Sequence, residues 1–142
     1  MKQGIASFEK RILHYTTFEM IYLNTPKNAR NQPENVQKEM EGKIILAATE
    51  KIDFPVLLDV QGSHYTSEGF SRFLQKTMNR GVRHFAFIIG GPYGFSEEVY
   101  AKIPQKLSLS SMTFSHQLIR LIFMEQLYRA FTILKGEPYH HA

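Results

Sequence analysis

The sequence predicts an α/β protein in which a mainly parallel sheet forms the middle of three layers. Three observations favour this class. Short apolar runs at residues 55–60 and 84–89 read as buried strands. Segments with apolar residues at helical spacing alternate with these runs. Both runs lead into glycine-containing loops, which is where parallel sheets place their ligands.

Length and composition fit one globular domain over residues 1–142. Hydrophobic residues make up 43% of the chain and charged residues 21%, and no window is apolar for long enough to cross a bilayer. The chain has no cysteine, which excludes disulfides and thiolate chemistry. Its first residues are charged and show no secretory signal, so a cytoplasmic protein is expected. The net charge of +4 suits a nucleic-acid partner but is also ordinary for an enzyme.

The N-terminal part is predicted to run from helix to strand to helix. Apolar residues lie on one face of a helix over 3–14, and FEMIYL at 18–23 reads as a strand. The polar stretch 24–33 is expected to be an exposed loop, with Pro33 in the first turn of a helix over 34–51.

The C-terminal part is predicted to contain two more helices. The first is capped by Thr66 or Ser67 and stops before Gly81. The second covers 117–135 and is apolar nearly all the way round, so it should be covered on more than one side. A second subunit could supply one of those covers, which predicts a two-fold dimer.

Three strand ends carry residues suited to a ligand: DVQG, IIGGPYG and LSLSSMT. The glycines let a ligand approach the backbone closely, although no phosphate-loop or dinucleotide motif is present. Residues 108–115 contain five hydroxyl side chains. Thr113 or Ser115 can cap the following helix, but a cap does not explain all five. A polar ligand would supply hydrogen-bond partners for the rest.

The C-terminal GEPYHHA offers Tyr139, His140 and His141. Adjacent histidines point in different directions and have no carboxylate at a ligand spacing, so no metal site is expected. Glu125 and Arg129 are four residues apart, and their simplest interpretation is an ion pair within one helix.

Five segments together resemble the RlmH family, methyltransferases of the SPOUT superfamily that act on a pseudouridine of large-subunit ribosomal RNA. The segments are GKIIL (42–46), LLDVQG (57–62), FIIGGPYGF (87–95), LSLSSMTFSHQLIRLIFMEQLYRAF (107–131) and GEPYHH (136–141). They occur in the family's order and spacing, and the match covers almost the whole chain.

The resemblance implies a deep trefoil knot at the C-terminal end, an exception to the rule that chains avoid threading. It also implies a homodimer through the C-terminal helix and S-adenosylmethionine bound in the knot. The family's cofactor contacts fall on Leu58, Gly90, Leu109, Ser110, Ser111, Met112, Thr113 and Phe114.

The resemblance further implies methylation of N3 of the pseudouridine, in a stem-loop of the assembled ribosome. Arg129, Tyr139 and His140 match family positions linked to activity. We expect His140 or Tyr139 near the N3 proton, and Arg129 in substrate positioning or charge stabilisation. Lys27, Arg30, Arg80 and Arg83 are possible phosphate contacts, although exposed basic residues more often serve solvation.

The chain departs from the family in one respect. Family members begin with a strand and a loop before the helix that starts here at about Gln3, so the sheet is expected to lack its first strand. This leaves two other readings open. One is a ribosome- or RNA-binding dimer of the same fold with impaired turnover, and the other is an α/β dimer that binds a different adenine-containing ligand.

Overall fold

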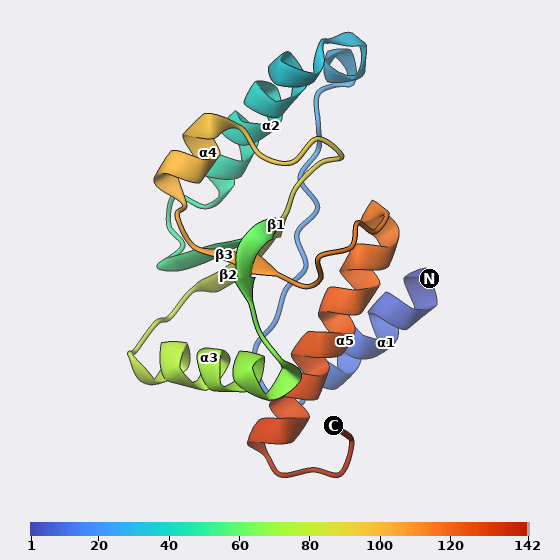
Figure 1. Ribbon diagram of the computed structural model, residues 1–142, viewed down its shortest axis with the longest axis vertical. Coiled ribbons are helices and arrows are strands. Elements are labelled where there is room, and N and C mark those ends of the chain that lie inside the picture. The colour runs from blue at the N-terminus through green and yellow to red at the C-terminus, as the bar shows by residue number, and fades with distance from the viewer. Residues whose placement is uncertain (142) are drawn as a thin grey trace. The chain divides into compact units, whose positions relative to one another are not determined.

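The computed structural model describes residues 1–141, which fold as an α/β protein (Figure 1). The chain divides into two compact units. The first unit consists of Met1–Met20, His64–Val82 and the residues from 109 onward, and the second of Ile21–Ser63 and Arg83–Ser108. None of the described helices is long and apolar enough to span a membrane.

A three-stranded sheet lies in the second unit, apart from its residue His64. Its strands are β1 (Phe54–His64), β2 (Phe85–Ile89) and β3 (Lys106–Ser108), in the order β2-β1-β3. The pairing of β1 with β2 is parallel and runs from Phe54 opposite Phe85 to Leu58 opposite Ile89. The two predicted strands and their parallel direction are therefore confirmed, whereas burial is confined to Val56 and Leu57 of β1 and Ile88 of β2.

Two helices cover this sheet within the second unit, α2 (Glu34–Ala48) and α4 (Glu97–Lys102), and a short 3₁₀ helix, η1 (Lys27–Asn31), precedes α2. Gly42 lets the two helices approach, because a Cβ there would lie 2.5 Å from the Ser96 hydroxyl. Helix and strand side chains form one apolar core, which consists of Ile45, Leu57, Ile88, Phe95, Val99 and Ile103.

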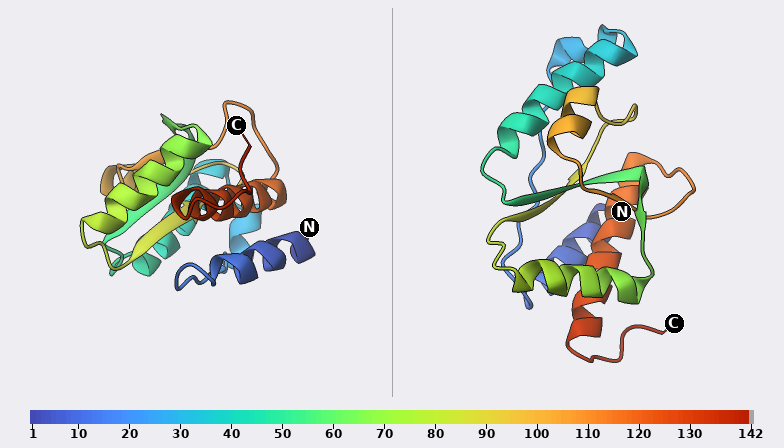
Figure 2. Two further views of the ribbon diagram at one scale, coloured as in Figure 1. Left: turned by 90° about the horizontal axis from the view of Figure 1, so that it is seen from below. Right: turned by 60° about the vertical axis from the view of Figure 1, so that its left-hand side comes forward.

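The first unit is helical. Its helix α5 (His116–Leu134) packs against both α1 (Lys2–Ile12) and α3 (Ser67–Asn79), and Figures 1 and 2 show α1 alongside α5. Aromatic pairs hold these contacts, with Phe8 against Tyr128 and Phe70 against Phe123. Two helices of the same chain thus cover part of the apolar surface of α5. That surface alone is therefore a weaker argument for a dimer than the sequence suggested.

The strand predicted at 18–23 is wrong. These residues belong to no strand, and the side chains of Ile21 and Tyr22 are 68% and 60% exposed. A mainly apolar run with aromatic residues, such as 18–23, forms a strand only where a neighbouring backbone completes its hydrogen bonds. None of the described strands takes that place. Helix α4 was not predicted, because six residues are too few to show a helical period. The three-layer arrangement and the knot stay predictions.

Candidate active site

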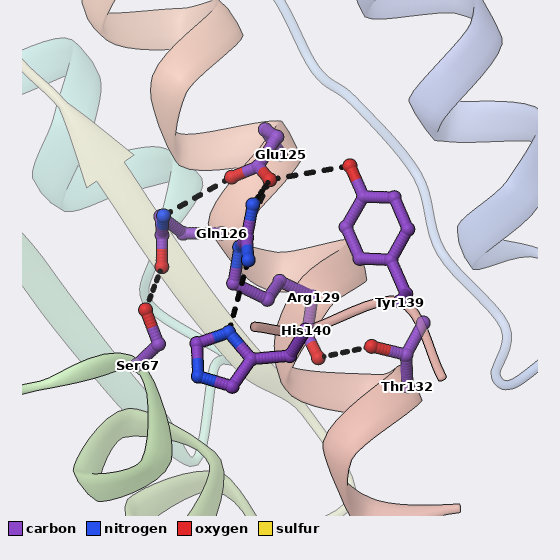
Figure 3. Close-up of polar contacts among 7 residues, drawn as sticks. All are labelled: Ser67, Glu125, Gln126, Arg129, Thr132, Tyr139 and His140. Atoms are coloured by element: carbon purple, nitrogen blue, oxygen red, sulfur yellow. Dashed lines mark hydrogen bonds and ion pairs between the residues drawn. The ribbon is translucent and has the colours of Figure 1, made fainter. Parts of the chain in front are cut away.

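Polar side chains from two helices and the C-terminal tail converge in the first unit. We call the group formed by Glu68, Glu125, Arg129, Tyr139 and His140 the tail cluster. Glu68 comes from the first turn of α3, Glu125 and Arg129 lie one turn apart on α5, and the last two residues follow the end of α5. Figure 3 shows four of the five side chains pointing toward one another.

The tail reaches this position because α5 ends in a tight C-terminal turn. Gly136 has φ +69°, in the left-handed region that favours glycine. Its amide donates to the carbonyl of Ile133 at 3.1 Å, and the next amide, of Glu137, donates to that of Thr132 at 2.9 Å. This pair of bonds is the Schellman motif, which satisfies the last carbonyls of a helix and turns the chain back.

Arg129 makes the expected ion pair with Glu125. Its Nε and Nη2 atoms donate to Glu125 Oε1 at 2.9 and 2.5 Å, and the hydrogen bond to this carboxylate raises the pKa of Arg129. Arg129 also contacts His140, with 2.9 Å between Nη1 and the ring atom Nδ1. The guanidinium therefore links α5 to the tail, which an isolated helix pair would not do.

His140 lies between Arg129 and Glu68. Its other ring nitrogen, Nε2, is 2.7 Å from Glu68 Oε1. The Glu68 pKa is lowered, first by a hydrogen bond from its own backbone amide and second by the bond with His140. The carboxylate is thus held ionised at the start of α3, where the helix dipole also favours negative charge.

The Tyr139 side chain is held as a protonated phenol that donates a hydrogen bond. Its hydroxyl donates to Glu125 Oε1 at 3.2 Å, and its ring packs against Tyr128 at 4.8 Å and lies 5.1 Å from the Arg129 guanidinium. Burial, followed by the nearby Glu125 charge, raises the Tyr139 pKa. A phenol with a raised pKa donates hydrogen bonds and is a poor acceptor of a proton.

The structure brings Arg129, Tyr139 and His140 together in one hydrogen-bonded group, and their role in catalysis stays a prediction. It also includes residues that the sequence reasoning missed: Glu68 directly, and Ser67 and Gln126 at the edge. The Ser67 hydroxyl donates to the Gln126 side-chain oxygen at 2.8 Å, and the Gln126 amide donates to Glu125 at 3.0 Å. No spacing rule links residue 68 to residue 140, so the sequence carried no signal for Glu68 beyond an acidic residue in a first helical turn.

Two of the predicted cofactor residues lie in the second unit. Leu58 is in β1 and pairs with Ile89, the last residue of β2. Gly90 follows directly, and a Cβ at this position would lie 2.8 Å from the Phe95 ring. The backbone at Gly90 is therefore closely covered on its Cβ side by an aromatic ring, and a larger residue would displace that ring.

The other six cofactor residues, 109–114, form the irregular segment between β3 and α5 in the first unit. The Ser110 hydroxyl accepts from the Met112 amide at 3.0 Å, and the Met112 side chain is 73% exposed. Ser115 caps α5 by accepting from the Leu118 amide at 3.4 Å, which decides between the two predicted caps. The described part of the chain contains no group of three or more acidic, His or Cys residues that could hold a metal ion.

The comparisons with known proteins agree with this architecture. The family described as "Predicted SPOUT methyltransferase" matches residues 1–140. The chain therefore belongs to the SPOUT methyltransferase family, and the resemblance drawn from the sequence is confirmed.

Within that family the chain is similar to proteins named ribosomal RNA large subunit methyltransferase H. It is 54% identical to the protein of Christiangramia forsetii, with 96% of this chain and 87% of the relative aligned. The proteins of Parabacteroides distasonis and Flavobacterium johnsoniae are 51% and 52% identical, over 98% and 96% of this chain and 88% and 87% of the relatives.

Proposed function

We propose that this protein is an S-adenosylmethionine-dependent methyltransferase that modifies N3 of a pseudouridine in large-subunit ribosomal RNA of the assembled ribosome. The observation that carries the proposal is the similarity to the large-subunit methyltransferases over nearly the full chain. The tail cluster supports it, because the three residues expected to act on the substrate lie within one hydrogen-bonded group.

The cofactor is proposed to be held by Leu58 and Gly90 and by the segment 109–114. This segment is suited to the task in three ways. It belongs to no helix or strand, so ladder hydrogen bonds do not use its amides; Ser111, Met112 and Thr113 are exposed; and Met112 offers an apolar contact. When bound, S-adenosylmethionine supplies an already activated methyl group on a sulfonium.

The chain's own residues must then orient the substrate and remove one proton. Productive geometry places N3 about 3–3.5 Å from the methyl carbon and in line with the bond that breaks. Arg129 is proposed to position the substrate or to stabilise charge. Tyr139 already donates to Glu125 and has a raised pKa, so His140 is the better candidate to accept the N3 proton.

The remaining expectations form part of the proposal. Residues 1–142 are proposed to act as a single SPOUT-type domain with a C-terminal trefoil knot, as a homodimer through α5, in the cytoplasm. The rival function is a ribosome- or RNA-binding protein of the same fold with impaired turnover. The relatives are named as methyltransferases, which favours the enzyme over this rival, and the hydrogen-bonded tail cluster supports the same choice.

The deciding experiment is transfer of labelled methyl from S-adenosylmethionine to assembled ribosomes that lack the modification, followed by mapping of the labelled nucleotide. Label on N3 of one large-subunit pseudouridine is the expected result. Free rRNA and isolated subunits serve as comparison substrates, and His140→Ala and Tyr139→Phe as comparison enzymes. No label from folded protein that binds the cofactor would refute the enzyme and support the rival, and normal turnover by both variants would refute the residue assignment.

A further inference from the structure

We propose that Glu68 is a positioning residue that fixes His140 as the tautomer protonated on Nε2, so that Nδ1 is the one ring atom able to accept a proton. This inference rests on the proposed function for its role in catalysis, although its structural part can be tested without turnover. Nothing in the sequence pattern or in the relatives' names assigns a role to residue 68.

The tautomer follows from the two partners of the ring. A guanidinium has only donors, so the 2.9 Å contact from Arg129 Nη1 requires a lone pair on His140 Nδ1. An ionised carboxylate has only acceptors, so the 2.7 Å contact with Glu68 Oε1 requires a hydrogen on Nε2. Both requirements are met only by the neutral ring with its proton on Nε2.

Glu68 is well placed for this role because hydrogen bonds fix its backbone at the start of α3. Thr66 caps the helix by accepting from the Gly69 amide at 3.0 Å, and Ser71, buried on the same turn, donates to the Glu68 carbonyl at 2.6 Å. The bond to His140 spans 72 positions of the sequence. A carboxylate on one ring nitrogen orients the imidazole and stabilises the cation that forms when the other nitrogen takes a proton.

This arrangement assigns the proton path. Methyl transfer forms an N3–C bond and breaks an S–C bond, whose electron pair stays on sulfur. The N3 proton leaves to Nδ1, and the single positive charge passes from the sulfonium to the imidazolium. In this structure the Arg129 guanidinium donates a hydrogen bond to Nδ1 of His140. It must therefore turn toward another acceptor before Nδ1 can take the proton. An RNA phosphate, which guanidinium groups bind readily, is such an acceptor.

The tautomer can be read from long-range ¹H–¹⁵N correlation spectra of the ¹⁵N-histidine-labelled protein at mildly alkaline pH, with His140 assigned by its loss in His140→Gln. The spectrum of the native protein should show a protonated Nε2 and an unprotonated Nδ1. A predominant Nδ1–H form would overturn the proposal, whether or not the protein methylates RNA, so its failure is distinct from failure of the proposed function.

Variants then test whether Glu68 is the cause. Glu68→Ala leaves the Arg129 contact at Nδ1 as the one described partner that selects the tautomer, so the Nδ1–H form should gain population. The same change should lower kcat on ribosomes about 10-fold or more, a fraction of the 100-fold or greater contribution of a general base, with little change in KM for S-adenosylmethionine. Glu68→Gln keeps an oxygen that can accept from Nε2, so it should retain the tautomer and recover part of the lost kcat.

The matched control is Glu98→Ala. Glu98 lies two residues after the cap of α4, as Glu68 does in α3, so both changes remove a first-turn carboxylate. The control should leave the His140 spectrum and kcat unchanged. A native-like spectrum and kcat in Glu68→Ala would overturn the proposal. If Glu68→Ala does not fold, the spectrum and kcat of Glu68→Gln decide, since mixed tautomers there would contradict the role of the accepting oxygen.

Discussion

The phenol of Tyr15 donates a hydrogen bond to the carboxylate of Glu137 at 2.7 Å, although the two residues are 122 positions apart. The Tyr15 ring also stacks on Phe131 of α5, with centroids 5.6 Å apart and planes 8° from parallel. The residues after α1 therefore hold the start of the tail, two positions before Tyr139 and three before His140. This contact connects the N-terminal helix to the site.

The first prediction concerns stability at alkaline pH. Burial, and then the bond to Glu137, raises the Tyr15 pKa to about 12 from 10.0. The folded state thus favours the protonated phenol, and this contribution is full below pH 10 and is lost as pH rises from 10 to about 12. In Tyr15→Phe the denaturation midpoint should fall less across this window than in the native protein.

The control for this change is Tyr93→Phe, at a tyrosine that is 45% exposed. Part of the alkaline loss should survive in Tyr15→Phe, because burial and the bond to Asp59 also raise the pKa of Tyr100 to about 12. An equal fall in the native protein and in both variants would show that the Tyr15 contact does not contribute in solution.

The second prediction concerns the core of the second unit. Leu57 is 0% exposed and packs with the apolar cluster of helix and strand side chains. Leu57→Ala should lower the free energy of unfolding by about 2–5 kcal/mol, as for other large-to-small core changes. Val60→Ala on the same strand, at a side chain that is 55% exposed, should change it by less than about 0.5 kcal/mol. Chemical denaturation measures both, and similar values would place Leu57 outside the core.

The third prediction concerns the contact between β1 and β3. A Cβ at Gly62 would lie 2.6 Å from the backbone nitrogen of Leu107, an atom that cannot move without shifting the strand. Gly62→Ala should therefore destabilise the protein by about 1–3 kcal/mol, the usual cost of overpacking.

Gly91→Ala is the informative comparison for Gly62. Its Cβ would meet the Glu41 carboxylate, the far end of a flexible side chain that can turn away. Its loss of stability, measured by thermal unfolding, should be smaller than that of Gly62→Ala. The reverse order would mean that β1 and β3 are less closely apposed at Gly62 than the structure shows.

The fourth prediction concerns the geometry of Arg129. The guanidinium contacts Glu125 through Nε and Nη2 and His140 through Nη1. An ammonium keeps the charge but cannot reproduce this planar set of donors. Arg129→Lys should therefore lower methyl transfer to ribosomes about 10-fold or more while the protein stays folded. Arg72→Lys on the exposed face of α3 is the control, and equal rates in the two variants would show that charge alone suffices.

Local patterns in the sequence predicted much of the secondary structure. Periodicity and caps located α2, α3 and α5, because their apolar faces and end residues lie close together in the chain. The strand expected at 18–23 failed because a strand depends on a neighbouring backbone that the segment itself cannot specify. Helix α4 is too short to show a period.

The residues of the candidate site that lie in local motifs were predicted, and the residue that joins it through tertiary packing was not. Arg129, Tyr139 and His140 come from motifs that are local in sequence, and the resemblance named them. Glu68 meets His140 only through the packing of α3 against α5 and the turn at Gly136. Contacts of this kind follow from tertiary structure, and no sequence pattern near position 68 predicts them.

The return of the tail onto α5 has a consequence for the gene. Chain ends usually tolerate change better than any other part of a protein. A stop codon directly after Glu137 would delete Tyr139 and His140 while sparing every described helix and strand, the C-terminal turn of α5 and the bond from Tyr15 to Glu137. The product would be expressed and folded but would lack the proposed chemistry. Such an allele would look normal in a test of protein abundance, and only an assay of the RNA modification would reveal it.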